Sequence, residues 1–354
     1  MYQSLQLCRA VAAVLVVLFH LGGAIGSDKY FKLPALAQGL YFGHSGVAFF
    51  FVLSGFIITH VHAGDLGRPE RLPGYLRKRL ARIYPPFLIV FGLVYAAGLA
   101  TPSLRATLPT DALVVLKALL LLPQDIAVVG GTSALVLIVA WSLHYELLFY
   151  ALFALAIVSR AAAAVAVAAL ALHGLSCLIG TACTFPRTFF ASHWLVLFAM
   201  GVAVARLARR AVSPWLALGT AWTGVLGFAL VALAEVSGLV PEDGALYLGY
   251  GLFSSFVVLG LVQAENAGAI AWRHPAVAAL GDASYALYLV HYPLISLACK
   301  LALAAGLKGP FGAALAFAGT LALCLAVAHV FHRGVERPLL RLLNRQRPAP
   351  SAPT

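Results

Sequence analysis

Long apolar runs alternate with short polar segments along the chain, and this alternation predicts the fold. A helix needs about 20 mainly apolar residues to cross a bilayer. The run at 112–122 is too short and ends at Pro123, so we expect a re-entrant or interfacial helix there. The pattern therefore predicts an all-α, polytopic integral membrane bundle of ten spans. They are residues 5–24, 40–61, 82–100, 133–157, 161–181, 191–208, 214–237, 245–264, 277–303 and 312–332.

Composition and charge support this architecture. The chain is 62% hydrophobic and 10% charged, whereas soluble domains carry about 25% charged residues. With the N-terminus in the cytoplasm, seventeen of the 24 Lys and Arg residues fall inside and seven outside. This bias predicts cytoplasmic N- and C-termini. The net charge of +12 is then explained by topology and contact with membrane lipids, so no nucleic-acid partner is expected.

The whole chain is expected to form one membrane domain, 1–345, followed by a disordered cytoplasmic tail, 346–354, which is rich in proline. Arg9 lies inside the first apolar run, which has no clear charged leader, so we expect this run to be retained. The five cysteines have no metal-ligand spacing, and Cys177 and Cys183 are expected to be unpaired thiols. The chain has no P-loop, HExxH or GxSxG motif, so neither a metal nor phosphate-energy coupling is expected.

Arg9 and His20 stand out in the first span. Eleven residues are about three helical turns, so both side chains share a face, roughly 16 Å apart along the axis. Ionisable groups in a span are costly and indicate a functional site. A snorkelling arginine and a structural histidine are the alternative explanation.

The cytoplasmic loop before the predicted third span is expected to end in the basic segment Arg77–Pro86. Arg79 and Arg82 are three residues apart and share a helical face. Two neighbouring guanidinium groups suit phosphate, which each can bind with two hydrogen bonds. For the cluster as a whole, anchoring by the positive-inside rule is the better explanation, whereas for the Arg79 and Arg82 pair both interpretations stay open.

The fourth span begins with Trp141 and Ser142 and carries Glu146 well inside it. A carboxylate at that depth must be protonated, paired or hydrated. It can orient an imidazole and raise its basicity, or pair with an arginine to hold helices together. We favour a functional role.

In the ninth predicted span, Ser284, Tyr288 and His291 follow the spacing i, i+4, i+7 and form one polar stripe next to Tyr285. Such a stripe faces other helices or a cavity. It favours hydrogen-bonded helix packing for the serine, and a second base or a substrate contact for His291.

Two other segments carry weaker signals. Gly46, Ser54 and Gly55 favour close helix packing in the second span, and His44, near its outer end, is a weak candidate for contact with an acceptor. Glu336 follows the last span and is expected to pair with Arg9 or with the arginines before the third span.

In this order, these segments resemble the membrane-bound acyltransferase family 3, especially its bacterial exopolysaccharide and O-antigen branch. The resemblance extends over nearly the whole chain. It implies ten spans with both termini inside, and transfer of an acyl group, usually acetyl, from cytoplasmic acetyl-CoA to a sugar hydroxyl. The matching motifs are Arg9 with His20, Phe50–Phe56, Arg79-x-x-Arg82-Ile83-x-Pro85, Trp141-Ser142-Leu143 with Glu146, Ser284-Tyr285-x-x-Tyr288-Leu289-x-His291, and Val335–Pro338.

The resemblance and the residues together suggest a mechanism. Acyl-CoA is a donor substrate rather than a bound cofactor, and a glycan or lipid-linked sugar is the acceptor. We expect Glu146 to orient His20, which acts as general base or carries the acyl group. The remaining roles are donor binding (Arg9, Arg79, Arg82), oxyanion stabilisation (Ser142, Tyr288, His291) and lining of the sugar site (Trp141, Tyr285).

A transporter or flippase for a glycan or lipid intermediate is the main alternative, because a polar line through a bundle fits it too. Transporters often contain inverted repeats, and the sequence has none that we can detect. An acyltransferase that modifies lipid or peptide with the same donor is a third interpretation. Some family members also end in an extracytoplasmic esterase-like domain. This chain stops soon after its last span, so we expect it to act alone.

Overall fold

The computed structural model of the chain describes residues 2–105, 108–129, 132–180, 183–271 and 274–343. Within these ranges the regular structure is helical and ten segments are long and apolar enough to cross a membrane, which confirms the predicted bundle. The main helices of these segments are α1 (Gln3–Gly26), α3 (Gly46–Val61), α4 (Leu72–Ala100), α8 (Trp141–Val158), α9 (Arg160–Ile179), α11 (Trp194–Leu207), α12 (Pro214–Val236), α13 (Gly244–Asn266), α15 (Ser284–Ala304) and α16 (Gly309–Phe331).

Shorter helices connect or extend these ten. As expected, the run after residue 111 forms no span: α6 has eight residues. The predicted tail 346–354 and Arg273 lie outside the described residues. The short elements are α2 (Pro34–Gly39), η1 (Tyr41–Ser45), η2 (Ala63–Asp65), η3 (Pro69–Arg71), α5 (Pro102–Arg105), α6 (Ala112–Leu119), α7 (Ile126–Val129), η4 (Ile138–Ala140), α10 (Arg187–Phe190), α14 (Pro275–Asp282), the π-helical turn η5 (His332–Glu336) and α17 (Arg337–Leu343).

Two predicted boundaries were wrong. The basic segment before the third span is not a loop, because α4 begins at Leu72 and carries Arg79 and Arg82 on its first turns. Leu, Arg, Lys and Ala are good helix formers, and long cationic side chains at a helix end can extend towards the membrane surface. The ninth span is also interrupted: Ala283 separates α14 from α15, so the polar stripe starts at the first turn of a new helix.

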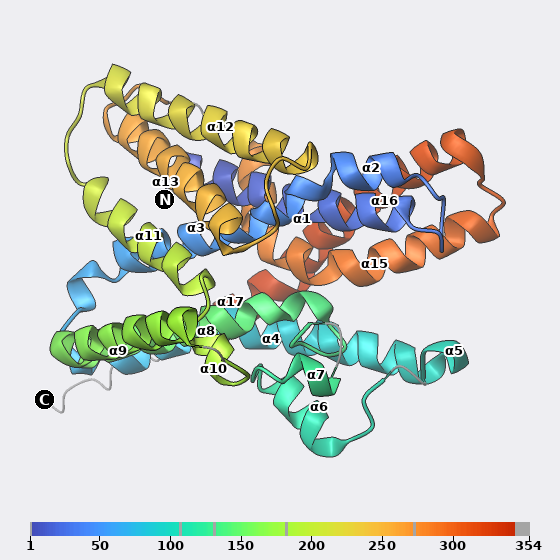
Figure 1. The fold of residues 1–354 in the computed structure, drawn as a ribbon, viewed down its shortest axis with the longest axis horizontal. Coiled ribbons are helices and arrows are strands. Elements are labelled where there is room, and N and C mark those ends of the chain that lie inside the picture. The colour runs from blue at the N-terminus through green and yellow to red at the C-terminus, as the bar shows by residue number, and fades with distance from the viewer. Residues whose placement is uncertain (1, 106–107, 130–131, 181–182, 272–273, 344–354) are drawn as a thin grey trace, which may run out of the picture.

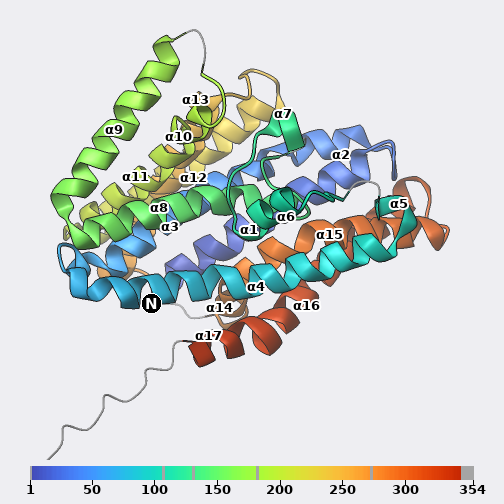
Figure 2. The same cartoon turned by 90° about the horizontal axis from the view of Figure 1, so that it is seen from below.

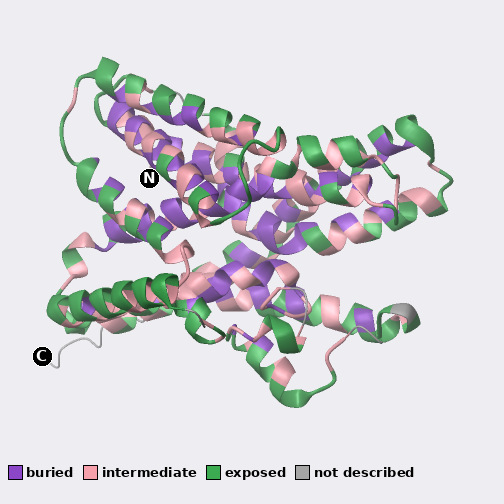
Figure 3. Cartoon of the chain, viewed as in Figure 1, coloured by how far each residue is buried: buried purple, intermediate pink, exposed green. Residues whose placement is uncertain are grey.

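Helix α3 lies at the centre of the bundle, where it packs against α1 and α11 (Figures 1 and 3). Small residues make these contacts possible, as the sequence predicted. A methyl group in place of the Gly46 hydrogen would lie 2.4 Å from the Ala12 carbonyl oxygen. At Gly55 it would lie 2.2 Å from the Phe198 carbonyl oxygen, so any larger residue would force the helices apart.

Helix α9 is the opposite case, because it leans away from the bundle at one edge (Figure 2) and none of the residues in its most apolar stretch is buried inside the protein. It is the helix most exposed to lipid. Cys177, in the last turn of α9, forms a disulfide with Cys183, which follows the helix. The expectation of two unpaired thiols was therefore wrong: the two residues are six positions apart in the sequence and their Cα atoms lie 5.3 Å apart, the usual separation in a disulfide.

The two ends of the bundle differ. Helices α2 and α5 lie at one end, and the connection from α3 to α4 lies at the other (Figures 1 and 2). The start of α4, the end of α3 and the start of α1 therefore meet at the end that holds most of the predicted site cations.

Candidate functional site

A cavity of about 740 Å³ opens between α1, α3, α4, α8, α15 and α17. We call it the central cavity. Five cationic and two acidic side chains line it, together with serines and tyrosines. Most of the predicted site residues are brought together here from distant parts of the sequence. The polar lining residues are Arg9, Ser54, Lys78, Arg79, Arg82, Ser142, Glu146, Tyr150, Asp282, Ser284, Tyr285, Tyr288, His332 and Arg337.

Arg9 enters the cavity from α1 and is held by the polar stripe of α15. Its Nη2 donates to the Ser284 hydroxyl oxygen at 2.9 Å. Within the described residues it forms no ion pair with a carboxylate. Its other N–H groups are thus available to an anion in the cavity.

Arg79 is positioned by a histidine that the sequence analysis missed. His62 Nδ1 lies 2.7 Å from Asp65 Oδ2, so this nitrogen carries the hydrogen, and Nε2 accepts from Arg79 Nη2 at 3.4 Å. Burial lowers the pKa of His62 although the Asp65 hydrogen bond opposes it, which keeps the ring neutral. Arg79 forms no ion pair with a described carboxylate, and its Nε is buried without a hydrogen-bond partner there.

Arg82 is in a different environment although it shares a helical face with Arg79. Its Nη1 donates to Glu336, which is fully buried, and its guanidinium lies 5.3 Å from the centre of the Tyr285 ring. His332 Nδ1 lies 2.9 Å from the other Glu336 oxygen. The predicted ion pair of Glu336 is confirmed, with Arg82 as its partner.

Glu146 faces the central cavity from α8, but it does not contact His20 in the described structure. Its Oε1 accepts hydrogen bonds from the Tyr150 hydroxyl at 2.5 Å and the Ser54 hydroxyl at 3.4 Å. The expected orientation of His20 by Glu146 was therefore wrong. Glu146 lies one helical turn from Tyr150, whose ring also packs 6.0 Å from the Arg79 guanidinium, so this carboxylate belongs to the cationic end of the site.

His20 pairs with His291 instead. His291 Nδ1 lies 3.1 Å from the Leu287 carbonyl oxygen and therefore carries a hydrogen, which leaves Nε2 as an acceptor for His20 Nδ1 at 3.2 Å. His20 Nδ1 also lies 3.0 Å from the Val16 carbonyl oxygen. The hydrogen of neutral His20 is thus on Nδ1, and its Nε2 keeps a lone pair without a partner among the described residues.

Tyr288 connects this histidine pair to the cavity. It lines the cavity, and its ring centre lies 5.8 Å from that of His291. Its hydroxyl donates to the Val139 carbonyl at 2.8 Å and lies 2.7 Å from the Ser142 hydroxyl oxygen. In this arrangement the Tyr288 hydroxyl hydrogen bonds to the Val139 carbonyl and the Ser142 hydroxyl hydrogen bonds to the Tyr288 oxygen. Both hydrogens are therefore already engaged within the protein.

The remaining predicted residues lie at the edge of this arrangement. Trp141 does not line the cavity and packs against Trp194 with ring centres 5.1 Å apart. Tyr285 does line it, but its hydroxyl donates to the Ile83 carbonyl at 2.9 Å. No group of three or more His, Cys, Asp or Glu residues in the described ranges is arranged to hold a metal ion.

A second buried cluster also escaped the sequence analysis. His44 Nε2 and the Tyr250 hydroxyl each lie 2.5 Å from an oxygen of Glu235, near the end of α12. His44 had been noted only as a weak candidate for acceptor contact. Glu235 is isolated in its apolar run, so nothing in the sequence indicated its partners.

Fold and cavity together define a polytopic helical membrane protein with an anion-attracting site inside the bundle. A profile of the family described as an acyltransferase domain, acyltransferase family 3, matches residues 2–329. The chain belongs to this family and is a membrane O-acyltransferase.

Individual relatives agree with this assignment. The exopolysaccharide production protein ExoZ of Rhizobium meliloti (strain 1021) is 31% identical over 317 residues, which cover 84% of this chain and 90% of the relative. Acyltransferase MdmB of Streptomyces mycarofaciens is 29% identical across 99% of this chain and 94% of the relative. Protein 2 in the picA locus of Rhizobium radiobacter is 30% identical across 41% of this chain. No solved structure matches the chain.

Proposed function

We propose that this enzyme transfers an acyl group, with acetyl as the expected one, from cytoplasmic acyl-CoA to a hydroxyl of an exported or cell-surface glycan. One observation carries the donor half of the proposal. The central cavity holds Arg9 and Arg79, two guanidinium groups without carboxylate partners in the described residues. Buried cations need counter-charges, and the phosphates of coenzyme A supply them.

The orientation follows from charge. The excess of Lys and Arg in the segments on one side supports a topology in which the cavity mouth, the N-terminus and the C-terminus face the cytoplasm. The bacterial relatives support a location in the bacterial inner membrane. The disulfide between Cys177 and Cys183 is consistent with this orientation. It lies at the C-terminal end of α9, on the outer side in this topology, and disulfides persist in oxidising compartments.

In this proposal Arg9 and Arg79 bind the donor phosphates directly. Arg82 adds to the positive potential of the cavity, but it stays paired with Glu336 and does not bind the phosphates directly. The pantetheine arm then runs along the face of α1 from Arg9 towards His20, roughly 16 Å away. Tyr288 and His291 continue the same line from the cavity wall to His20.

His20 Nε2 is the reactive atom in this mechanism. As general base, it takes the proton of the acceptor hydroxyl while that oxygen attacks the thioester carbon, and the C–S bond breaks. The proton passes to the coenzyme A thiolate. In the relay variant, Nε2 attacks the thioester carbon first and the C–S bond breaks, which gives an acyl-imidazolium and the coenzyme A thiolate. The acceptor oxygen then attacks the acyl carbon, the C–N bond breaks to restore neutral His20, and the hydroxyl proton passes to the thiolate.

His291 takes the role that the sequence analysis had given to Glu146. Its Nε2 accepts from His20 Nδ1 and stabilises the imidazolium that forms when His20 Nε2 gains a proton. Ser142, Tyr288 and His291 remain the candidates for stabilising the thioester oxyanion. Each would first have to release the protein oxygen to which it now donates.

The acceptor is proposed to be a glycan or a lipid-linked sugar. ExoZ is described as an exopolysaccharide production protein, and this supports a carbohydrate acceptor for the present chain. Trp141 and Tyr285 are the aromatic side chains proposed to line the sugar site.

Acyl transfer by the purified protein in proteoliposomes tests the proposal. Radiolabelled acetyl-CoA is supplied with extracted exopolysaccharide or lipid-linked oligosaccharide, and labelled glycan is measured for wild type and His20→Ala. A labelled product that is lost in His20→Ala, while acetyl-CoA still binds, is expected. Absence of donor consumption with every glycan offered would overturn the glycan acceptor, and absence of acetyl-CoA binding would overturn the donor.

A further inference from the structure

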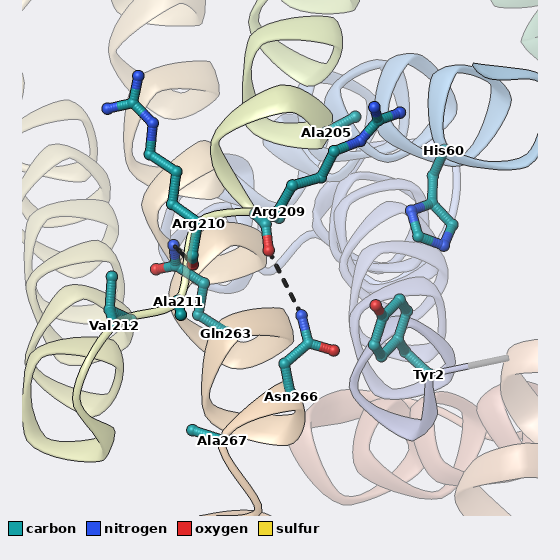
Figure 4. A pocket seen from close by; sticks show the side chains of 11 residues that line it. Tyr2, His60, Ala205, Arg209, Arg210, Ala211, Val212, Gln263, Asn266 and Ala267 are labelled. Carbon is teal, nitrogen blue, oxygen red and sulfur yellow. Dashed lines mark hydrogen bonds between the residues drawn. The ribbon is translucent and has the colours of Figure 1, made fainter. Parts of the chain in front are cut away.

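A second hollow, separate from the central cavity, lies between the start of α1 and the ends of α3, α11 and α13. Its volume is about 310 Å³, less than half that of the central cavity. We call it the side pocket. Its polar lining consists of Tyr2, His60, Arg209, Arg210, Gln263 and Asn266, and Figure 4 shows their arrangement.

The side pocket is lined by hydrogen-bond donors and cations. Among its described lining residues none is acidic, and Arg209 and Arg210 form no ion pair with a described carboxylate. The nearest carboxylate along α13, Glu265, is already used. It accepts from the backbone N–H of Gln3 at 2.9 Å and of Ser4 at 3.0 Å, and so caps the start of α1.

The wall of the side pocket is fixed by side-chain amides. Gln263 Nε2 lies 3.3 Å from the Leu207 carbonyl oxygen, and Asn266 Nδ2 donates to the Ala208 carbonyl oxygen at 3.4 Å. These bonds hold the turn after α11 against α13. The backbone that carries Arg209 is therefore anchored, whereas its long side chain is exposed and able to turn.

Four of the lining side chains surround one open space. In Figure 4, Arg209, His60, Tyr2 and Asn266 stand around it, whereas Arg210 points to the other side. The Tyr2 and His60 ring centres are 5.4 Å apart, and His60 stacks on buried Phe56. Among the described residues, the Tyr2 hydroxyl and both His60 ring nitrogens have no hydrogen-bond partner within the protein.

We propose that the side pocket binds a phosphate-bearing anion, the headgroup phosphate of an acidic phospholipid or a soluble phosphate ester. Arg209 supplies the charge and two parallel N–H donors, the geometry that suits phosphate. Tyr2 and His60 supply hydrogen-bond donors from the other side. The pocket lies at the end of the bundle where basic residues meet the headgroup layer, so a lipid is the nearest source. This inference goes beyond the proposed acyl transfer and does not depend on it.

The competing explanation is diffuse attraction between basic residues and an acidic membrane. A substitution of Arg206 distinguishes this explanation from a specific site in the side pocket. Arg206 lies three residues before Arg209, is equally exposed, has no described carboxylate partner and does not line the side pocket. Arg209→Gln and Arg206→Gln remove the same charge from the same segment. Only the former removes a lining residue.

The test uses the full chain in phosphatidylcholine nanodiscs titrated with phosphatidylglycerol, with bound lipid counted by native mass spectrometry. We expect Arg209→Gln to weaken phosphatidylglycerol binding about fivefold or more and Arg206→Gln less than twofold. Equal losses for both variants, or none for Arg209→Gln, would overturn the proposal. If Arg209→Gln does not fold, Tyr2→Phe decides, because it keeps the ring and every charge: weaker binding supports the pocket and unchanged binding refutes it.

A second arm identifies the source of the phosphate. Glycerol phosphate or inorganic phosphate is added to the protein in phosphatidylcholine alone, where Tm is measured, and in phosphatidylcholine with phosphatidylglycerol, where competition for bound lipid is measured. Competition with phosphatidylglycerol, or a rise in Tm that Arg209→Gln abolishes, identifies a soluble ligand. Binding of phosphatidylglycerol alone identifies a lipid, and binding of neither overturns the proposal.

Discussion

The central cavity and the histidine pair lie along the same face of α1, yet they are built in opposite ways. Around Arg9 the structure is open and charged, with five cations and few carboxylates. Around His20 it is closely packed: Val16 and Val17 on α1 are almost completely buried, and His291 is fully buried. Every ring nitrogen of the pair has a partner in the described residues except His20 Nε2.

This difference suggests a division of labour. An open cationic cavity binds a large anion and tolerates its movement, whereas a closely packed pair holds one lone pair in a fixed direction. Substitutions in the two regions should therefore have different kinetic signatures. Changes at the histidine pair should lower kcat, and changes at the cations should raise KM for the donor.

The largest effect is expected for His20→Ala. Loss of a general base or nucleophile should lower kcat by about 10²–10⁴-fold, with little change in KM for acetyl-CoA. Initial rates of acyl transfer in proteoliposomes measure both constants. His329→Ala, a histidine near the end of α16 without an assigned role, is the matched control and should keep full activity. An active His20→Ala enzyme would refute the assignment.

His291 should have the next largest effect, because it acts through His20. His291→Phe removes the acceptor for the His20 imidazolium, so we expect kcat to fall about 10–100-fold with an unchanged donor KM. His291→Gln keeps an acceptor oxygen and should recover part of the rate. If both variants lose the same activity, or if KM alone changes, His291 does not orient His20.

The fold could be predicted from the sequence to a large extent, because membrane spans are specified by length and hydropathy. All ten spans and the short helix at Ala112 follow from that rule. The start of α4 could not be predicted in this way. The helix extends beyond the hydrocarbon layer through polar residues, so the start of the apolar run does not mark the start of the helix. The break at Ala283 also went unrecognised: Asp282 and Ser284 flank it, but the longer runs on either side are apolar and were interpreted as one continuous span.

The site could be predicted only in part. Helical spacing placed Ser284, Tyr288 and His291 on one stripe, and that relation holds within α15. Partners between helices are set by packing that spacing does not encode. For this reason Glu146 was assigned to His20, whereas its contacts are Tyr150 and Ser54.

Arg79 is the cation whose loss should most affect donor binding. Arg79→Gln removes a charged donor that has no carboxylate partner in the described structure, so KM for acetyl-CoA should rise about tenfold with kcat nearly unchanged. Isothermal titration of coenzyme A gives an independent value. A normal KM combined with a large loss of kcat would instead assign Arg79 the same kinetic role as the histidine pair. The proposed division between donor binding and chemistry would then be wrong.

Arg82 should have the smallest effect on turnover, although sequence spacing makes it equivalent to Arg79. Its charge is already neutralised by buried Glu336, so Arg82→Gln should change KM for acetyl-CoA less than about threefold. The cost should appear in stability instead, because removing one member of a buried ion pair strands the other charge. The Tm of Arg82→Gln should fall, and Arg82→Gln combined with Glu336→Gln should recover much of the loss. If the donor KM rises as much as in Arg79→Gln, then Arg82 leaves Glu336 to bind the donor. The Arg82–Glu336 ion pair would then exist only in the donor-free enzyme.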